Sequence, residues 1–108
     1  MLFLIVIVIK LDNKFLDFQL ITQEGILVSD QVKKVKVKTS MGGLTILPNH
    51  AEIKSDLVPG TMKSSYYDDS KEEQKFNIAD GVIEASPSKV TIITRTAKVK
   101  EDKDPYQL

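Results

Sequence analysis

Cysteine is absent from this 108-residue sequence, and histidine occurs once, at His50. Without cysteine the chain has no disulfide, no thiolate metal ligand and no thiol nucleophile. A zinc site normally takes three or four ligands from Cys, His and carboxylates, so a single histidine argues against a metal centre. We therefore expect no metal and no cofactor, and most enzyme classes are disfavoured.

An excess of charge of one sign is also lacking, because 15 Lys and Arg balance 15 Asp and Glu. No overall field draws the chain toward nucleic acid or an anionic membrane. The densest basic cluster is Lys33, Lys34, Lys36 and Lys38. Strand alternation places three of these lysines on one solvated face, where they protect the strand from edge-to-edge pairing. We expect no nucleic-acid partner.

Long hydrophobic runs are limited to residues 2–9, which Lys10 and Asp12 bring to an end. A transmembrane helix needs about 20 apolar residues, so this run is too short. No basic stretch precedes it and no small-residue cleavage site follows it, unlike in a signal peptide. Its β-branched residues favour a strand. We expect residues 1–14 to be an apolar extension, packed on the domain's own sheet or buried by an additional partner.

Helical periodicity is hard to find, whereas strand signals and turn residues recur every 8–12 residues. This spacing predicts an all-β fold, a two-sheet antiparallel β-sandwich of about ten short strands. The sandwich is expected over residues 15–97, and residues 98–108 are expected to be a charged tail. The segments with the clearest strand patterns are 15–21, 26–28, 34–39, 44–47, 61–67, 75–79, 82–85 and 89–97.

Two local features are predicted within these strands. Val32 is out of register with Val35 and Val37, so we expect a bulge near Lys33. Asp80-Gly81 has the composition of a two-residue hairpin turn, which we expect to lead into the next strand.

Catalytic constellations are absent from the sequence. His50 has no nucleophile elbow, cysteine or paired carboxylates to accompany it, so we interpret it as a structural or interface histidine. The acidic run of Asp68, Asp69, Glu72 and Glu73 lacks the alternating oxygen ligands and central glycine of a calcium loop. The residues themselves favour a non-enzymatic protein, and one interpretation is a stand-alone β-sandwich interaction module.

Several short segments carry a more specific resemblance when they are taken in order. They are TQEGIL at 22–27, GLTILPNHA at 43–51, VPG at 58–60, DGVIEASP at 80–87 and VTIITRTA at 90–97. In this order and spacing, the chain over 15–97 resembles the N-terminal β-sandwich domain of the ATP synthase epsilon subunit, called delta in mitochondria.

The resemblance implies a non-catalytic rotor subunit of an F-type or F-like ATPase. Such a subunit clamps the gamma subunit of the central stalk and couples rotation to ATP synthesis or hydrolysis, while the alpha and beta subunits carry the chemistry. It would be cytoplasmic and peripheral to the inner face of the cell membrane. By resemblance, Thr22 and His50 lie at the gamma interface. The same resemblance implies a loop that would face a membrane c-ring, formed by Ser40, Met41, Gly42, Gly43, Leu44 and Thr45.

The chain departs from the family pattern in three places. Thr45 and Asn49 stand where the family usually has glycine, so a different loop geometry is expected. Gly43 stands where an acidic residue is common, which weakens the expectation of a c-ring contact. Only eleven residues follow Ala97, where the family's regulatory pair of C-terminal helices begins. The regulation and nucleotide binding of those helices are therefore not carried over.

Overall fold

The computed structural model describes residues 14–66 and 73–100. The expected apolar extension lies outside the described residues except for Lys14, as do Asp68, Asp69 and Glu72 of the acidic run. None of the described segments forms a helix that could span a membrane. The described strands are β1 Leu16–Thr22, β2 Gly25–Thr39, β3 Gly42–Ile46, β4 Ile53–Leu57, β5 Gly60–Tyr66, β6 Gln74–Ile78, β7 Gly81–Ala85, β8 Lys89–Thr94 and β9 Ala97–Val99.

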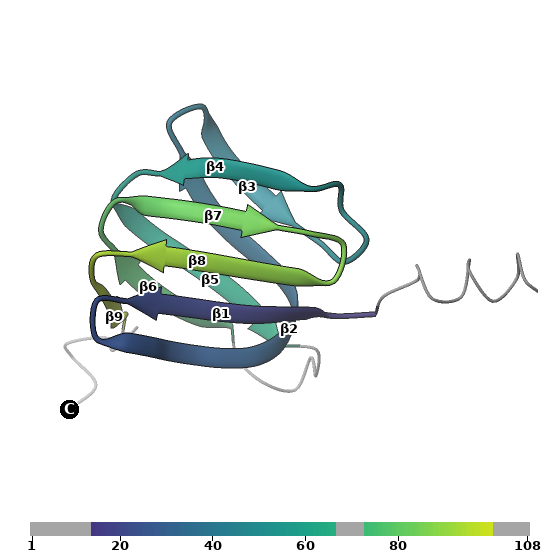
Figure 1. Cartoon of the computed structure of the whole chain (residues 1–108), viewed down its shortest axis with the longest axis horizontal. Coiled ribbons are helices and arrows are strands. Elements are labelled where there is room, and N and C mark those ends of the chain that lie inside the picture. The colour runs from purple at the N-terminus through teal and green to yellow at the C-terminus, as the bar shows by residue number, and fades with distance from the viewer. Residues whose placement is uncertain (1–13, 67–72, 101–108) are drawn as a thin grey trace, which may run out of the picture.

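The strands form one continuous sheet that folds over on itself. Its order is β4-β7-β8-β1-β2-β5-β6-β9, with β3 also paired to β2. The 15-residue strand β2 pairs with β1 through its first half and with β3 and β5 through its second half. The first layer is therefore β4-β7-β8-β1 and the second is β3-β2-β5-β6-β9 (Figure 1). The prediction of an all-β sandwich is confirmed.

The core lies between the two layers and follows strict alternation on most strands. In β1, Leu16, Phe18 and Leu20 are buried, while the residues between them face outward. The predicted bulge near Lys33 is confirmed, since the pairing of β2 with β5 shifts register between Val32 and Lys34. The extra residue allows valines at both odd and even positions of β2 to reach one core. The other core side chains are Val35, Val37, Ile46, Leu57, Met62, Phe76, Ile78, Ile83, Ala85, Val90 and Ile92.

The sandwich departs from the predicted antiparallel pairing at one pair, because β1 and β8 run parallel. Strands distant in sequence can pair in either direction, since the long connection does not constrain them as a hairpin does. The predicted hairpin at Asp80-Gly81 is also wrong. Strand β6 pairs with β5 and β9, whereas β7 pairs with β4 and β8. The chain crosses from the second layer to the first at this point.

Glycine is needed at position 81 for a different reason than a hairpin turn. A Cβ added there would lie 2.2 Å from the carbonyl oxygen of Ile93 in β8. The Asp-Gly pair therefore marks a close approach between backbones, which only glycine allows.

A second crossing divides the strand expected at 89–97. Strand β8 ends at Thr94 and β9 begins at Ala97 in the other layer. The backbone N–H of Lys100 donates to the carbonyl oxygen of Lys75 at 2.8 Å. Residues 98–100, which we expected in the charged tail, thus extend the second layer.

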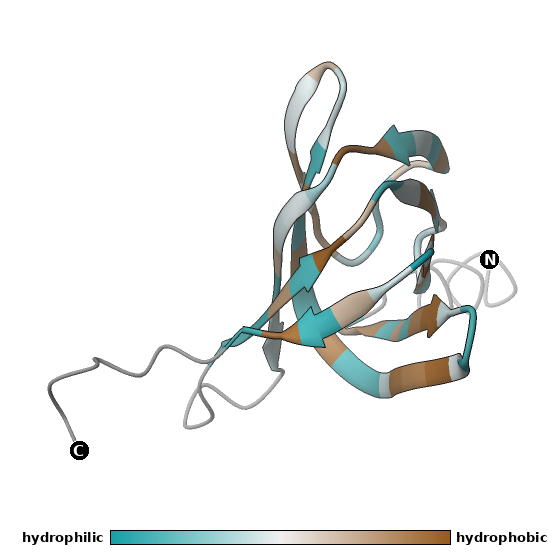
Figure 2. Cartoon of the chain, turned by 90° about the vertical axis from the view of Figure 1, so that its left-hand side faces the viewer, coloured by the Kyte–Doolittle hydropathy of each residue, from teal (hydrophilic) through white to brown (hydrophobic). Residues whose placement is uncertain are grey.

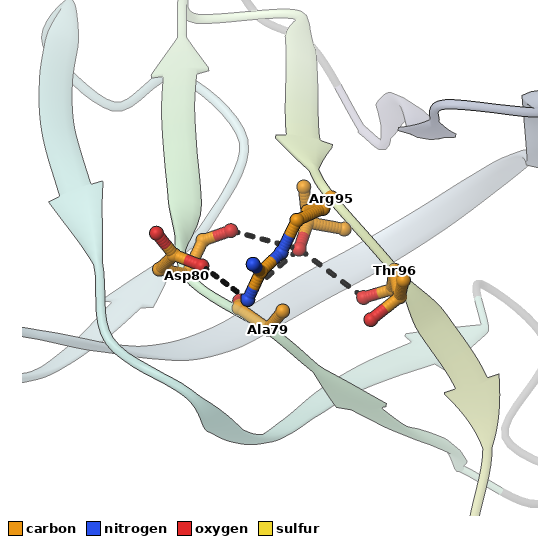
Figure 3. A network of polar contacts seen from close by, with 5 residues as sticks. Ala79, Asp80, Arg95 and Thr96 are labelled. Carbon is orange, nitrogen blue, oxygen red and sulfur yellow. Dashed lines mark hydrogen bonds and ion pairs between the residues drawn. The ribbon is translucent and has the colours of Figure 1, made fainter.

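The two crossings lie side by side and are joined by one buried hydroxyl. Thr94 Oγ1 lies 3.1 Å from the carbonyl oxygens of Ala79 and Asp80 and 3.2 Å from that of Thr96. The backbone N–H of Ala79 donates to Thr96 O at 3.0 Å. An exposed ion pair between Arg95 and Asp80, 3.3 Å long, covers the junction (Figure 3).

Candidate interaction surface

Thr22, one of the residues expected at an interface, closes the β1–β2 hairpin. Its hydroxyl accepts a hydrogen bond from the backbone N–H of Glu24 at 3.2 Å and donates to Gly25 O at 3.5 Å. Gly25 has a φ of 115°, in the region that favours glycine. The half-buried Thr22 side chain therefore stabilises its own turn, in addition to lying at the expected interface.

The β2–β3 hairpin repeats the same turn at the other end of β2. The hydroxyl of Thr39 accepts from the N–H of Met41 at 3.1 Å and donates to Gly42 O at 3.0 Å. Gly42 has a φ of 118°. Sequence reasoning missed this repetition, although the shared Thr-x-x-Gly pattern at 22–25 and 39–42 is its visible signal.

The segment expected to be a loop from Ser40 to Thr45 is mostly strand. Only Ser40 and Met41 form the turn, and Gly42–Ile46 is β3. Thr45 pairs regularly with Lys36, so its position needs no glycine. The Met41 side chain is 97% exposed at the tip. This hairpin projects beyond the body of the sandwich, at the top of Figure 2.

His50 lies in the connection between β3 and β4. Asn49 has a φ of 69°, a conformation that asparagine tolerates better than most residues, so the glycine position of the family pattern is accommodated. The N–H of Asn49 donates to Pro87 O at 2.8 Å, which ties the connection to the β7–β8 turn. His50 is half-buried, and its Nδ1 lies 2.9 Å from Ala51 O.

The structure does not bring Thr22 and His50 together. Thr22 ends β1, whereas the N–H of Asp17, near the start of β1, donates to Ser88 O in the turn that also holds Asn49. A strand of seven residues is about 20 Å long. The two candidate residues therefore lie at opposite ends of the first layer.

An exposed apolar row crosses the outer face of the first layer beside Thr22. Val82 pairs with Ile93, Ile93 with Ile21, and Ile21 with Ile26, so the four residues lie in line across β7, β8, β1 and β2. The side chains of Val82, Ile93 and Ile26 are 47%, 48% and 60% exposed. Sequence reasoning missed the row because the pairing of distant strands creates it. Contiguous exposed apolar residues of this kind mark interaction sites.

Chemical sites are not evident in the described part of the chain. Within residues 14–66 and 73–100, no group of three or more His, Asp or Glu side chains is placed to hold a metal. The residues expected at an interface lie at the two ends of the first layer and at the β2–β3 tip. We call Val82, Ile93, Ile21 and Ile26 the apolar row.

Comparison with known families decides what kind of protein carries these surfaces. The model of the beta-sandwich domain of the ATP synthase delta/epsilon chain matches residues 15–100. The chain belongs to this family. Within the family it is 30% identical over 89 residues to the ATP synthase epsilon chain of Desulfosudis oleivorans, covering 82% of this chain and 65% of the relative. The epsilon chain of Hydrogenovibrio crunogenus is 36% identical over 85 residues, covering 79% of this chain and 57% of the relative.

Solved structures share the fold of this delta/epsilon family member. A chain of the Euglena gracilis mitochondrial ATP synthase superposes with a TM-score of 0.76 at 20% identity, covering 85% of this chain and 57% of that one. A chain from the central stalk and c-ring of the Tetrahymena thermophila enzyme gives 0.68 at 16% identity, covering 89% and 74%. Among the curated relatives, the chain spans 65% of the Desulfosudis oleivorans epsilon chain and 57% of the Hydrogenovibrio crunogenus epsilon chain.

Proposed function

We propose that this delta/epsilon family member is a non-catalytic central-stalk subunit of an F-type or F-like ATPase. In this role it binds the gamma subunit and couples rotation to ATP synthesis or hydrolysis, on the cytoplasmic side of the cell membrane. The family match over residues 15–100 and the relatives named ATP synthase epsilon chains support the proposal. Catalysis then belongs to the alpha and beta subunits, which it contacts only through the stalk.

The apolar row is the observation that carries the gamma contact. Fully burying an aliphatic side chain contributes roughly 1.5–3 kcal/mol, so covering the exposed halves of Val82, Ile93 and Ile26 contributes about 2–4 kcal/mol in all. Thr22 borders the row and fixes the hairpin that carries Ile26. We therefore assign the main gamma contact to this end of the first layer. A gamma subunit that also reaches His50 extends about 20 Å along the layer.

The β2–β3 tip is the part of the subunit that we assign to the c-ring. It projects from the sandwich and ends in the fully exposed Met41, with glycines at 42 and 43 following it. Ser40 Oγ donates to Asp56 Oδ1 of β4 at 3.0 Å, so the tip is held against the first layer. A tip without its own charge suits packing and hydrogen bonding better than an ionic contact.

Copurification with the gamma subunit from the same organism tests the proposal. We expect the wild-type chain to bind gamma and Ile93→Asp, in the middle of the apolar row, to bind at least about tenfold more weakly, because a carboxylate would be buried unpaired. Val99→Asp is the matched control, since Val99 is 65% exposed but lies on β9 in the other layer. It should bind as wild type. Circular dichroism confirms that both variants fold.

Two results would overturn the assignment. Equal binding by Ile93→Asp and Val99→Asp would exclude the apolar row as the contact. Failure of the wild-type chain to bring down any ATPase subunit from native cells would instead favour a stand-alone β-sandwich interaction module.

A further inference from the structure

Lysines dominate the outer face of the second layer, which the proposed gamma contact does not use. Alternation places them there, because Val35, Val37, Met62 and Phe76 point into the core from the same strands. Glu73 is the carboxylate that the described strand ends bring to this face. The lysines are Lys34, Lys36 and Lys38 of β2, Lys63 of β5, Lys75 of β6, and Lys98 and Lys100 at β9.

Four of these lysines form a straight row across four neighbouring strands. Lys36 pairs with Lys63, and Lys63 pairs with Lys75. The backbone bond from Lys100 N to Lys75 O continues the row onto β9. Adjacent strands are about 4.8 Å apart, so the row is about 14 Å long. We call these four residues the lysine row.

Like charges placed directly across a sheet are destabilising, so the facing pair Lys36 and Lys63 lowers the stability of the isolated chain. Lys36 and Lys63 make no ion pair with any residue in the described part of the chain. Glu73 accepts a hydrogen bond from Ser65 Oγ at 3.1 Å, at a position beside the row rather than in it. A binding partner with negative charges along one line would remove this repulsion.

The β2 end of the row is hollowed, and its lining combines lysine and threonine side chains with apolar surface. A shallow groove of about 240 Å³ lies among Lys36, Lys38, Lys63, Leu44, Thr45 and Thr61. Next to it, Thr61 Oγ1 donates to Asn77 Oδ1 at 3.1 Å, and Lys100 Nζ lies 3.4 Å from Thr61 Oγ1. The face therefore offers ammonium groups on a surface stiffened by cross-strand hydrogen bonds.

We propose that the lysine row binds an acidic α-helix of a partner protein, with one carboxylate per turn facing the sheet. A helix advances about 5.4 Å per turn, and the row advances about 4.8 Å per strand. Over three intervals the mismatch is about 2 Å, which flexible lysine side chains accommodate. The apolar row lies on the other layer, so the two contacts are compatible and this proposal does not rest on the first.

The composition of the face favours an acidic protein over nucleic acid or lipid. Among the described residues that point outward from β2, β3, β5, β6 and β9 in this region, none is arginine or aromatic. Base stacking on aromatic rings and arginine is the usual means of holding single strands, and it is missing here. Membrane surfaces are bound by faces that combine basic with large apolar side chains, and the lysine row alternates with small polar ones.

The experiment titrates the 108-residue chain with two synthetic helical peptides of equal composition. Both are stapled, so that helicity is the same, and only one carries its glutamates on a single face. We expect amide shifts on β2, β5, β6 and β9 with the one-faced peptide, and binding at least about tenfold weaker for the triple variant Lys36→Gln, Lys63→Gln, Lys75→Gln. The matched control, Lys14→Gln, Lys54→Gln, Lys89→Gln, loses equal charge elsewhere and should bind within about twofold of wild type.

Each other outcome overturns the proposal. Equal loss in the two triple variants, or equal binding of the two peptides, would mean that only net charge matters. Tighter binding of a 20-nucleotide oligothymidylate, or of vesicles containing 30% phosphatidylserine, would identify a different class of partner. No binding of either peptide would leave the lysine row as a solvated surface.

Discussion

Thr22 and Thr39 make the same pair of hydrogen bonds at the two ends of β2. Each hydroxyl accepts from the backbone N–H two residues on and donates to the carbonyl oxygen of a glycine three residues on. Strand β2 joins the layers, so these turns fix the positions of both hairpins that it forms. The apolar row and the β2–β3 tip thus depend on equivalent threonines.

Replacing Thr22 tests how far the turn positions the apolar row. Thr22→Ala loses both side-chain bonds, and we expect the free energy of unfolding to fall by about 1 kcal/mol. Thr22→Ser retains the hydroxyl and should lose less than half of that. Urea unfolding followed by circular dichroism measures the difference. Equal losses in Ala and Ser variants would show that the methyl group, not the hydroxyl, stabilises the turn.

Glycine at position 81 should be far less replaceable than glycine at 43. A Cβ at 81 would meet Ile93 O at 2.2 Å and Thr94 Cα at 2.9 Å, whereas one at 43 meets nothing within 4 Å. We expect Gly81→Ala to lower the free energy of unfolding by about 2 kcal/mol or more, because the backbone of β8 would have to shift away from the new methyl group. Gly43→Ala should stay within about 0.5 kcal/mol of wild type. Thermal unfolding of the two variants makes the comparison, and similar melting temperatures would contradict it.

The Thr94 hydroxyl holds the two layer crossings together and should be costly to remove. Thr94 is 3% exposed, and three carbonyl oxygens surround its Oγ1. Thr94→Val keeps the shape but removes the one hydroxyl proton that these carbonyl oxygens share, so we expect a loss of about 1–3 kcal/mol. Thr91→Val, on the outer face of the same strand, is the control and should change stability little. Urea unfolding that ranks the two variants equally would refute this role.

Stability at alkaline pH should depend on Tyr66. Burial, with a smaller contribution from the Asp30 carboxylate, raises the pKa of Tyr66 above its ordinary 10.0. The folded chain therefore keeps the phenolic proton where the unfolded chain has lost it. This contribution to stability is complete below the ordinary pKa and is lost as the pH rises through the folded one. Urea unfolding between pH 9 and 11 should show a steeper decline for wild type than for Tyr66→Phe, and parallel curves would exclude the effect.

The sequence predicted the features that alternation and local turn chemistry control. The β1 strand, the bulge at Lys33 and the strands β5 and β6 all follow from patterns within a few residues. The pattern failed at Asp80-Gly81, because a hairpin turn and a close backbone approach require the same glycine. The pattern also predicted one strand over 89–97, because the crossing at 95–96 between β8 and β9 leaves no mark in the hydrophobic pattern.

The candidate sites show the same division between local and long-range information. The β2–β3 tip was expected from the family resemblance, and its turn has a local signal in the Thr-x-x-Gly pattern at 39–42. The apolar row and the lysine row could not, because each depends on pairing between strands that are far apart in the sequence. Ile21 and Ile93 become neighbours only through the parallel β1–β8 pair, the one pairing that an antiparallel expectation excludes.

Lys63 stands at the centre of the lysine row, opposite Lys36 on one side and Lys75 on the other. Removing its charge relieves the repulsion from Lys36, so Lys63→Gln should raise the free energy of unfolding by about 0.5 kcal/mol at low salt. The control Lys54→Gln instead breaks an exposed 3.8 Å ion pair with Glu84 and should be neutral or slightly destabilising.

Salt screens exposed charges over about 3 Å at 1 M, against about 30 Å at 0.01 M. The gain from Lys63→Gln should therefore shrink between 0.01 M and 1 M sodium chloride, as urea unfolding at both concentrations can measure. A gain that persists at high salt would trace to side-chain packing rather than charge, and no gain at all would mean that the row carries no repulsion for a partner to relieve.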